Sequence, residues 1–348
     1  MAANFTTYGD ITPRQAAFSV AGFLTRAIPN MVLEKFGQTY VVPKNNTQTA
    51  KFRRYFIENG TGSYSGNAGK YSMPLALTPL TEGVTPTGKK LDNKDYTVTL
   101  LQYGDYIGFT DVIVDTHEDY PAVLQQMVEV LGESAAHTVE TLRFNVLKAG
   151  TNVFYANGNA RNAVNTKITL GLQRKVTRSL KRQNARMITS VLKSTPAYNT
   201  QPIESAFIGL VHPDVENDIR DMDGFISIKQ YGPATAPFDG EIGAVEDVRY
   251  IRSTVFEPWA DAGGTAGGTV VSTTGTNADV YPVLYVARDA YGIVALRGGD
   301  VAQIMVVNPK PAESDPLAQR GTVGWKLWNA TVILQDAFLV RAEVAATA

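Results

Sequence analysis

The sequence contains no cysteine, and only three of its 348 residues are histidine. Without cysteine, the chain has no disulfide, no thiolate nucleophile and no cysteine-ligated zinc site. This composition fits assembly in a reducing compartment, where disulfides do not form.

The three histidines give little support for a metal or catalytic site. His117 could join neighbouring acidic residues around a metal, but its segment, DTHEDY, is better interpreted as a helix start. His137 lacks the spacing of a zinc-binding helix, and His212 precedes Pro213 in what reads as a turn. No G-x-S-x-G elbow is present. A Ser-His-Asp triad stays open as an alternative, because its members need not be adjacent in sequence.

The sequence also lacks an excess of charge of either sign and lacks long apolar runs. Lys and Arg number 32 against 33 Asp and Glu, which gives a formal net charge of -1. Nucleic-acid-binding domains usually have a clear basic excess, so any contact with nucleic acid is expected to be local and weak. No window reaches the roughly 18 consecutive apolar residues of a membrane span. The first residues, MAANFTTYGDITPR, lack the basic and apolar regions of a signal peptide.

Glycine-rich and acidic stretches match known binding loops only superficially. Residues 83–90 fit the pattern G-x-x-x-x-G-K, but Lys90 replaces the Ser or Thr that would bind Mg²⁺, and a strand is expected to follow where a helix is required. The glycines at 60, 62 and 66 have the wrong spacing for a dinucleotide turn. The acidic residues between 214 and 223 lack the spacing of a calcium loop. The sequence therefore predicts no catalytic residue, no cofactor and no metal.

The hydrophobic content predicts a folded chain with more than one lobe. Apolar residues make up 44% of the sequence, enough for a sizeable interior. A chain of 348 residues is too long for one compact core. Because no sharp linker separates the segments, we expect the lobes to interleave.

The strongest helical signal runs from about residue 120 to residue 148. Apolar residues recur there every three or four positions, as on one buried face of a long helix. Asp119 and Pro121 suit its start, and Gly150 suits its end. Gly132, in the middle, costs about 1 kcal/mol relative to alanine, so it is a candidate site of bending. The apolar positions are Val123, Leu124, Met127, Val130, Leu131, Ala135, Val139, Leu142 and Val146.

Two regions before this helix are expected to be extended. Residues 49–57 alternate like a strand, and residues 91–110 are also strand-like. The stretch between them is rich in Gly, Ser, Asn and then Pro, which favours loop and extended chain. Residues 58–100 therefore predict a long two-stranded excursion. Because an isolated two-stranded ribbon is marginally stable in water, we expect it to lie on another copy of the chain.

The remaining segments predict one more helix and several strands. Thr169 suits the N-cap of a helix whose polar face is basic. We interpret that face as solvated, with ion pairs to other subunits; the alternative is a surface for nucleic acid or an acidic partner. Strands are expected within 206–212, 248–254, 281–307 and 322–344, whereas the Gly/Thr-rich residues 260–279 predict an exposed or disordered loop. The basic residues are Arg174, Lys175, Arg178, Lys181 and Arg182.

Four segments together resemble one known family. They are LTEGVTPTGKKLDNKDYTVTLLQYGDYIGFTDVIVDT, HPDVENDIRDMDGF, PFDGEIGAVEDVRYI and GTVGWKLWNATVILQDAFLVRAEV. In order and spacing they are similar to the major capsid proteins of tailed bacteriophages, in the branch named after a coliphage that carries an RNA polymerase in its virion. The likeness covers nearly the whole chain.

The resemblance implies an α+β fold of the Hong Kong 97 type. Its N-terminal arm would be residues 1–50, its extended loop 58–100 and its axial domain 165–310. The peripheral domain would combine residues 51–57, 101–164 and 311–348, with the long helix at 120–148 as its spine. The lysine–asparagine cross-link known in this fold type is not carried over, because no residue here identifies the partner or the assisting acid. Contacts between subunits are expected at Phe18, Phe23, Tyr64, Lys70, Lys89, Lys90 and Lys94.

The sequence thus predicts a major capsid protein with no enzymatic activity. Copies of the chain would form hexamers, pentamers and an icosahedral head around double-stranded DNA. The expected partners are other copies, a portal, a separate scaffolding protein and decoration proteins, with no membrane. The expected location is the virion capsid, after assembly in the host cytoplasm. The alternatives are a β-rich virion decoration or adhesin protein and a hydrolase that uses His117 or His212.

Overall fold

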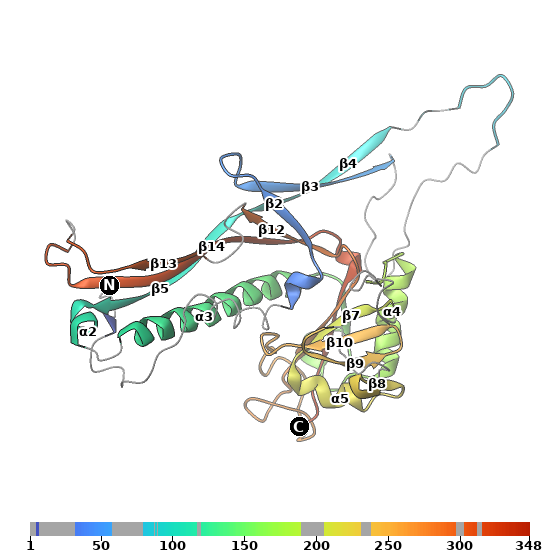
Figure 1. Cartoon of the computed structure of the whole chain (residues 1–348). Helices are drawn as coiled ribbons and strands as arrows, with labels where there is room; N and C mark the ends of the chain where they lie inside the picture. The colour runs from blue at the N-terminus through green and yellow to red at the C-terminus, as the bar shows by residue number, and fades with distance from the viewer. Residues whose placement is uncertain are drawn as a thin grey trace, which may run out of the picture.

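The computed structural model describes residues 5–6, 32–57, 79–86, 88, 90–116, 120–188, 205–230, 238–296, 303–311 and 315–348. These residues form two bodies that meet at the end of one long helix, α3 (Tyr120–Lys148) (Figure 1). We call the first body the limb; it consists of α3 and a six-stranded sheet. We call the second body the lobe; it is built on a seven-stranded sheet. A two-stranded ribbon projects away from both.

The limb sheet is organised around one long strand, β14 (Arg320–Ile333). β5 (Leu101–Thr110) pairs antiparallel with β14 along its whole length. On the other edge of β14, β13 pairs with its first part and β12 with its last part. The strand order is β1-β5-β14-β12-β2, with β13 also paired to β14. The shorter strands are β1 (Phe5–Thr6), β2 (Gln38–Val42), β12 (Tyr291–Leu296) and β13 (Gln303–Val307).

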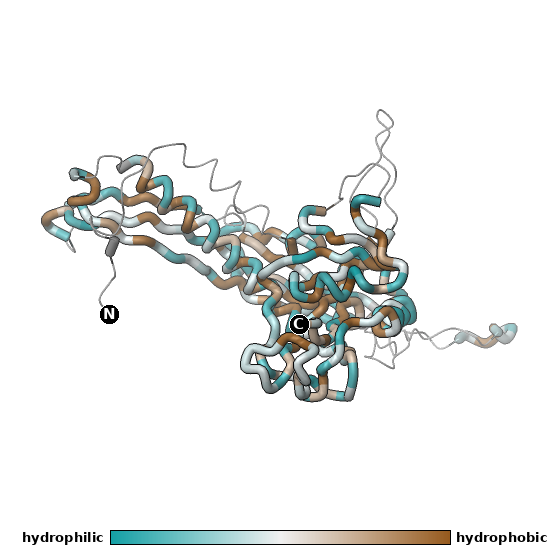
Figure 2. The backbone as a smooth tube through the Cα atoms, turned by 90° about the horizontal axis from the view of Figure 1, so that it is seen from below, coloured by the Kyte–Doolittle hydropathy of each residue, from teal (hydrophilic) through white to brown (hydrophobic). Residues whose placement is uncertain are grey.

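Helix α3 covers one face of the limb sheet. Apolar and polar residues alternate along the helix and strands of the limb (Figure 2), and the apolar ones meet between the two layers. The helix is continuous through Gly132. The predicted apolar stripe is wrong at Val130, which is 53% exposed, because it lies off the line of every fourth residue, from Val123 to Val139, that faces the limb sheet. The buried cluster joins Val123, Met127, Leu131, Ala135 and Val139 to Phe109, Val323, Trp325 and Leu327.

Short helical segments connect the larger elements. α2 (Asp111–Thr116) precedes α3, and the expected cap of α3, Asp119, lies outside the described residues. The single 3-10 turns are η3 (Leu33–Lys35), η4 (Arg161–Ala163), η5 (Pro213–Val215), η6 (Ile228–Gln230) and η7 (Asp336–Phe338).

The lobe sheet mixes strands from distant parts of the chain. Its order is β6-β15-β11-β7-β10-β9-β8. The strands β7, β11 and β15 are buried at every position, as expected for strands covered on both faces. The bounds are β6 (Val153–Tyr155), β7 (Phe207–Val211), β8 (Phe225–Ser227), β9 (Glu241–Val245), β10 (Val248–Arg252), β11 (Tyr281–Val286) and β15 (Leu339–Val344).

Different elements cover the two faces of the lobe sheet. On one face lie α4 (Leu170–Arg182) and α5 (Glu216–Arg220), whose apolar residues pack on Phe207 and Val211. On the other face, Ile208 and Leu210 contact a cluster that includes Phe144 near the end of α3. The lobe core is therefore completed by the helix of the limb.

The ribbon pairs β3 (Thr49–Ile57) with β4 (Leu91–Thr99). Its base rests on the limb, where Ala50, Phe52 and Val98 join the apolar cluster of Val294 and Ala330. The strand signal over 91–110 was correct, but it covers two strands. The chain turns out of the ribbon at Leu100, whose N–H donates to the Gln48 carbonyl at 2.8 Å, and continues as β5 of the limb.

The sheets do not follow the domain boundaries expected from the sequence. β12 and β13 fall in the expected axial range 165–310 but pair in the limb sheet, whereas β15 of the range 311–348 and β6 of the range 101–164 pair in the lobe sheet. The chain crosses between the two bodies several times, and strand partners at such distances leave no local signal.

The Gly/Thr-rich residues 260–279 were expected to be an exposed or disordered loop; they form an irregular surface segment, exposed at 267–269 and 273–276, that is held in one conformation. Two carboxylates hold the loop in place: Asp279 accepts from Thr273 Oγ1 at 2.9 Å, and Asp261 accepts from Thr274 Oγ1 at 2.9 Å. Val270 and Ala278 of the loop are buried. Short polar side chains can stabilise an irregular segment through such local hydrogen bonds.

Candidate functional site

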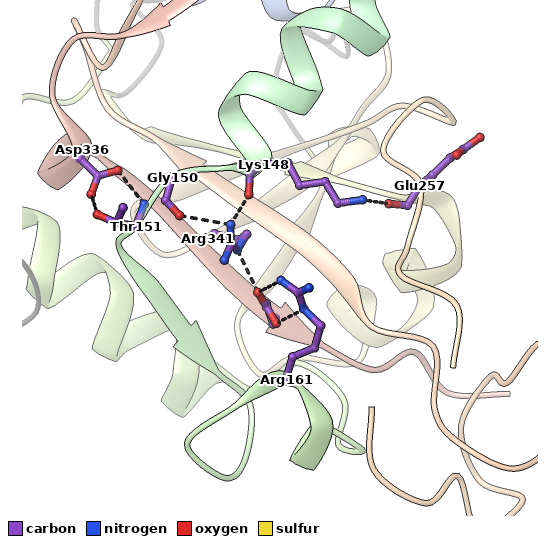
Figure 3. A network of polar contacts seen from close by, with 8 residues as sticks. Lys148, Gly150, Thr151, Arg161, Glu257, Asp336 and Arg341 are labelled. Carbon is purple, nitrogen blue, oxygen red and sulfur yellow. Dashed lines mark hydrogen bonds and ion pairs between the residues drawn. The ribbon is translucent and has the colours of Figure 1, made fainter. Parts of the chain in front are cut away.

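The end of α3 meets the lobe in a group of charged residues around one tryptophan. This junction cluster consists of Lys148, Arg161, Trp259, Arg341 and Glu343. Figure 3 shows Lys148, Arg161 and Arg341 of the cluster with the neighbouring chain. The Arg161 guanidinium lies 3.5 Å and the Lys148 ammonium 4.1 Å from the Trp259 ring centroid. Cations placed over an indole ring at such distances are attracted by its π electrons.

Glu343 is the carboxylate of this cluster, and its side chain is completely buried. Arg161 donates to it through Nε and Nη2, both at 2.8 Å, and Arg341 donates through Nε at 2.9 Å. The bond to Glu343 raises the pKa of Arg161 above its ordinary value. A buried carboxylate between two guanidinium groups strongly favours one geometry, because removal of a partner leaves a buried charge uncompensated.

Arg341 also binds the end of the spine helix. Its Nη1 donates to the carbonyl of Gly150 at 3.1 Å and to the carbonyl of Lys148 (Figure 3). The last carbonyls of a helix have no partner within the helix, so a basic side chain there satisfies them. Nearby, the Thr151 N–H donates to Asp336 Oδ1 at 2.9 Å. The junction cluster therefore fixes α3 to the lobe.

The sequence analysis missed the junction cluster. A signal for it exists in β15, where Arg341 and Glu343 lie two positions apart in an otherwise apolar strand. Side chains two apart in a strand share a face, so the spacing of Arg341 and Glu343 is the signal from which a buried ion pair could have been predicted. Nothing in the sequence indicated Arg161 or Trp259 as its neighbours.

A second polar site joins the N-terminal segment to α3. We call it the arm site; it consists of the turn Val32–Phe36 together with Glu140 and Tyr291. Glu140 Oε1 accepts from the N–H groups of Val32 and Leu33 at 3.0 and 3.1 Å. Tyr291 of β12 donates to the Leu33 carbonyl. Glu140 thus caps the start of η3 from another element.

The surroundings of Glu140 are unusual for a carboxylate. The residue is buried, and burial raises its pKa to about 7, against the lowering effect of the two backbone N–H groups and of Arg143. Arg143 itself pairs with Glu34 of the turn at 3.2 Å. The sequence analysis had placed no role on Glu140.

The basic face of α4 is partly neutralised within the chain. Arg174 donates to Glu246 through Nε at 2.9 Å, and Lys181 pairs with Asp247. The β9–β10 turn therefore supplies partners for these two residues within the chain, and ion pairs to other subunits stay a prediction. As predicted, Thr169 caps the helix, accepting from the Leu172 N–H at 3.3 Å. In the described part of the chain, no ion pair involves Lys175, Arg178 or Arg182.

Only two of the predicted subunit-contact residues can be placed in the structure. Lys94 lies on β4 at the base of the ribbon, beside a pocket of about 300 Å³ that Gly150, Thr151 and Asp336 also line. Lys90 comes directly before β4. Whether either touches another subunit stays a prediction. Phe18, Phe23, Tyr64, Lys70 and Lys89 lie outside the described residues.

Of the histidines considered for chemistry, His212 has a structural role. His212 caps η5 by accepting from the Asp214 N–H at 3.3 Å, and Asp214 accepts from Tyr281 Oη at 2.7 Å. His137 is exposed on α3, and His117 lies outside the described residues. Across the ranges that the structure describes, no three His, Asp or Glu side chains are grouped to hold a metal ion.

The segment 83–90, which matched a phosphate-binding pattern, leads into a strand. Residues 79–86 are irregular, and β4 begins at Leu91. A phosphate loop requires a helix N-terminus at this point, so the pattern match is a coincidence, as predicted. No described helix is long and apolar enough to cross a membrane.

Comparison with solved structures finds this fold in phage capsids. The capsid of Ralstonia phage GP4 is similar with a TM-score of 0.59 at 12% identity, over 99% of this chain and 98% of that chain. The cyanophage Pam1 capsid has a TM-score of 0.56 at 12% identity, over 99% of each chain. The head of Helicobacter pylori bacteriophage KHP40 has a TM-score of 0.55 at 12% identity, over 88% of this chain and 86% of that chain.

The sequence profile of one family covers most of the chain. The phage capsid protein family matches residues 94–342, which include all of α3, α4, β5 and β14. No curated protein matches the chain. The family match gives the chain a structural role in the shell of a virion, as the resemblance of its segments implied. The chain belongs to the phage capsid protein family, and it is a major structural subunit of a phage capsid.

Proposed function

We propose that the chain is a Hong Kong 97-type subunit that assembles into hexamers, pentamers and an icosahedral head around double-stranded DNA. In this assignment the limb is the peripheral domain, the lobe is the axial domain, and the ribbon is the base of the extended loop. The branch with a virion RNA polymerase remains our preferred relationship. Assembly would take place in the host cytoplasm with a portal and a separate scaffolding protein.

The ribbon is the observation that carries this proposal. It extends beyond the body, and toward its tip Tyr55 and Leu91 are exposed. Two-stranded ribbons of this length gain too little from their own contacts to persist alone. A neighbouring subunit would cover the apolar side chains and supply the area that a specific interface needs, about 1,000 Å² or more.

Head-to-tail contacts between the lobes of neighbouring subunits would form a closed ring if the rotation from one subunit to the next adds up to a full turn. The arm and ribbon would then link neighbours within and between rings. Near-neutral total charge suits a wall that encloses DNA without binding it tightly.

The first test is the assembly state of the purified full chain, by light scattering and negative-stain electron microscopy. Shells, tubes or capsomers are expected, and a stable monomer at all concentrations would contradict the proposal. The second test removes residues 60–90 and joins the ribbon strands by a short Gly-Ser turn. We expect this variant to keep a cooperative unfolding transition and lose shell assembly. Normal assembly of this variant, or unfolding of its limb and lobe, would contradict the proposed role of the loop.

A further inference from the structure

The arm site holds the N-terminal turn Val32–Phe36 on α3 through one side chain. Both backbone donors at the start of the turn point to the same oxygen, Glu140 Oε1. The apolar residues Val32, Leu33 and Phe36 are buried beside Phe144 and Leu147 of α3. The turn is thus held on the helix by apolar packing and by hydrogen bonds to one carboxyl group.

The second oxygen of Glu140 makes the site sensitive to charge. Glu140 Oε2 is buried and, within the described part of the chain, has no hydrogen-bond partner. A buried, ionised oxygen without a donor is costly, because the hydration it has lost is not replaced. A protonated carboxyl keeps Oε1 as the acceptor for the two N–H groups and lowers that cost, because an unpaired neutral hydroxyl is far less costly to bury than an ionised oxygen.

We propose that the arm site is a protonation-dependent latch: the turn Val32–Phe36 is held tightly on α3 while Glu140 is protonated and is released more readily when Glu140 is ionised. The latch is a property of the single subunit. Its consequence for the shell, an arm that is freed toward neighbours at higher pH, rests on the proposed capsid function.

The direction follows from the groups that face the carboxyl. Arg143 on α3 favours the ionised form, Glu34 in the turn opposes it, and Tyr291 on β12 is neutral and directed to the Leu33 carbonyl. Burial outweighs these effects and raises the pKa of Glu140 from 4.5 to about 7. Since the pKa of the docked state is the higher one, docking is tightest below pH 4.5, weakens as the pH rises to about 7, and is constant above. The docking equilibrium should change by about three hundredfold across this window.

The test is hydrogen exchange of the Val32 and Leu33 amides in the full chain between pH 4.5 and 8, corrected for intrinsic exchange rates. The protection factor reports the opening of the turn. We expect it to fall by about three hundredfold, in a decline that begins near pH 4.5 and levels off near pH 7. In Glu140→Gln, which mimics the protonated carboxyl, protection should be high and independent of pH. Glu133→Gln, on the same helix, is the matched control and should follow the wild type.

Two results would overturn the latch: protection in the wild type that does not change with pH, or the same pH dependence in Glu140→Gln. The wild-type protein alone can contradict the latch, by showing no change of protection with pH. The test therefore does not depend on whether Glu140→Gln folds. If the wild type forms shells and shows no titration, the latch is wrong and the capsid function stands. If the titration appears and no assembly occurs under any condition, the latch stands and the proposed assembly fails.

Discussion

The lobe and the limb differ in how completely they bury their sheets. In the lobe, β7, β11 and β15 are buried at every position, with helices on one face and the end of α3 with the arm turn on the other. In the limb, α3 covers one face, and β13 exposes Met305, Val306 and Val307 by 41, 44 and 53%. The lobe therefore satisfies its own strands, whereas the limb leaves apolar strand residues for other molecules to cover.

This difference predicts which substitutions should lower the stability of the single chain and which should weaken its assembly. Changes in the lobe should act first on folding, since its core is complete within one chain. Changes on the open side of the limb should act first on association, because exposed apolar patches commonly mark interfaces. The four substitutions below test this separation, beginning with the largest expected effect.

Phe144→Ala should lower the free energy of unfolding by about 4 kcal/mol, since it opens a cavity where α3 enters the lobe core. Phe144 is 2% exposed and contacts Phe256 with ring centroids 5.1 Å apart. Val130→Ala, on the exposed side of the same helix, should change it by about 0.5 kcal/mol or less. Urea unfolding monitored by tryptophan fluorescence measures both. Equal effects would mean that α3 is not part of the lobe core.

Glu343→Gln should cost about 3 kcal/mol of unfolding free energy, because Arg161 and Arg341 lose the buried charge that compensates them. The control is Glu246→Gln, which removes the partner of Arg174 at the surface and should cost under about 1 kcal/mol. The comparison uses urea unfolding at neutral pH. A small effect of Glu343→Gln would show that the Trp259 ring and the helix carbonyls suffice to hold Arg161 and Arg341.

Gly132→Ala should stabilise α3 by at most about 1 kcal/mol, because alanine loses less backbone entropy in a helix but its methyl group must fit at a buried position. If the spine helix bends at Gly132 when a shell expands, the variant should assemble and then expand more slowly than the wild type. Time-resolved light scattering of assembled shells gives the rate. Expansion at the wild-type rate would eliminate Gly132 as the bending site.

Val307→Ser should change stability least, by about 0.5 kcal/mol or less, because the side chain is already half exposed. Its effect should appear in assembly, as a higher protein concentration required for shells. Sedimentation and electron microscopy measure that concentration. If Val307→Ser destabilises the monomer and leaves assembly unchanged, the contrast between lobe and limb does not hold at β13.

Much of the local structure could be predicted because its signals are local. The spine helix was predicted at 120–148 and observed at Tyr120–Lys148, since its periodicity, first-turn proline and terminal glycine all agree. The cap at Thr169 and the strand over 49–57 were equally readable. In each case a pattern of a few neighbouring residues fixes the element.

The remaining features depend on contacts between distant residues. Glu140 lies more than one hundred residues from the Val32 and Leu33 amides that it binds, and nothing near it in sequence distinguishes it from Glu133. The assignment of β12 to the limb and β15 to the lobe is fixed by strand pairing across the chain. The ranges expected from the sequence grouped β12 with strands of the lobe and β15 with strands of the limb, because a short apolar run indicates a strand without indicating its sheet.

The place of β15 in the lobe sheet has a consequence for synthesis. It lies between β6 and β11, so until the ribosome has translated residues 339–344, β6 has no partner strand, β11 pairs only with β7, and Glu343 cannot join Arg161. The nascent chain can build helices and hairpins meanwhile, but the lobe closes only after translation reaches this strand. Non-local pairing of this kind delays folding, and here the delay would keep unfinished polypeptides from entering a growing lattice.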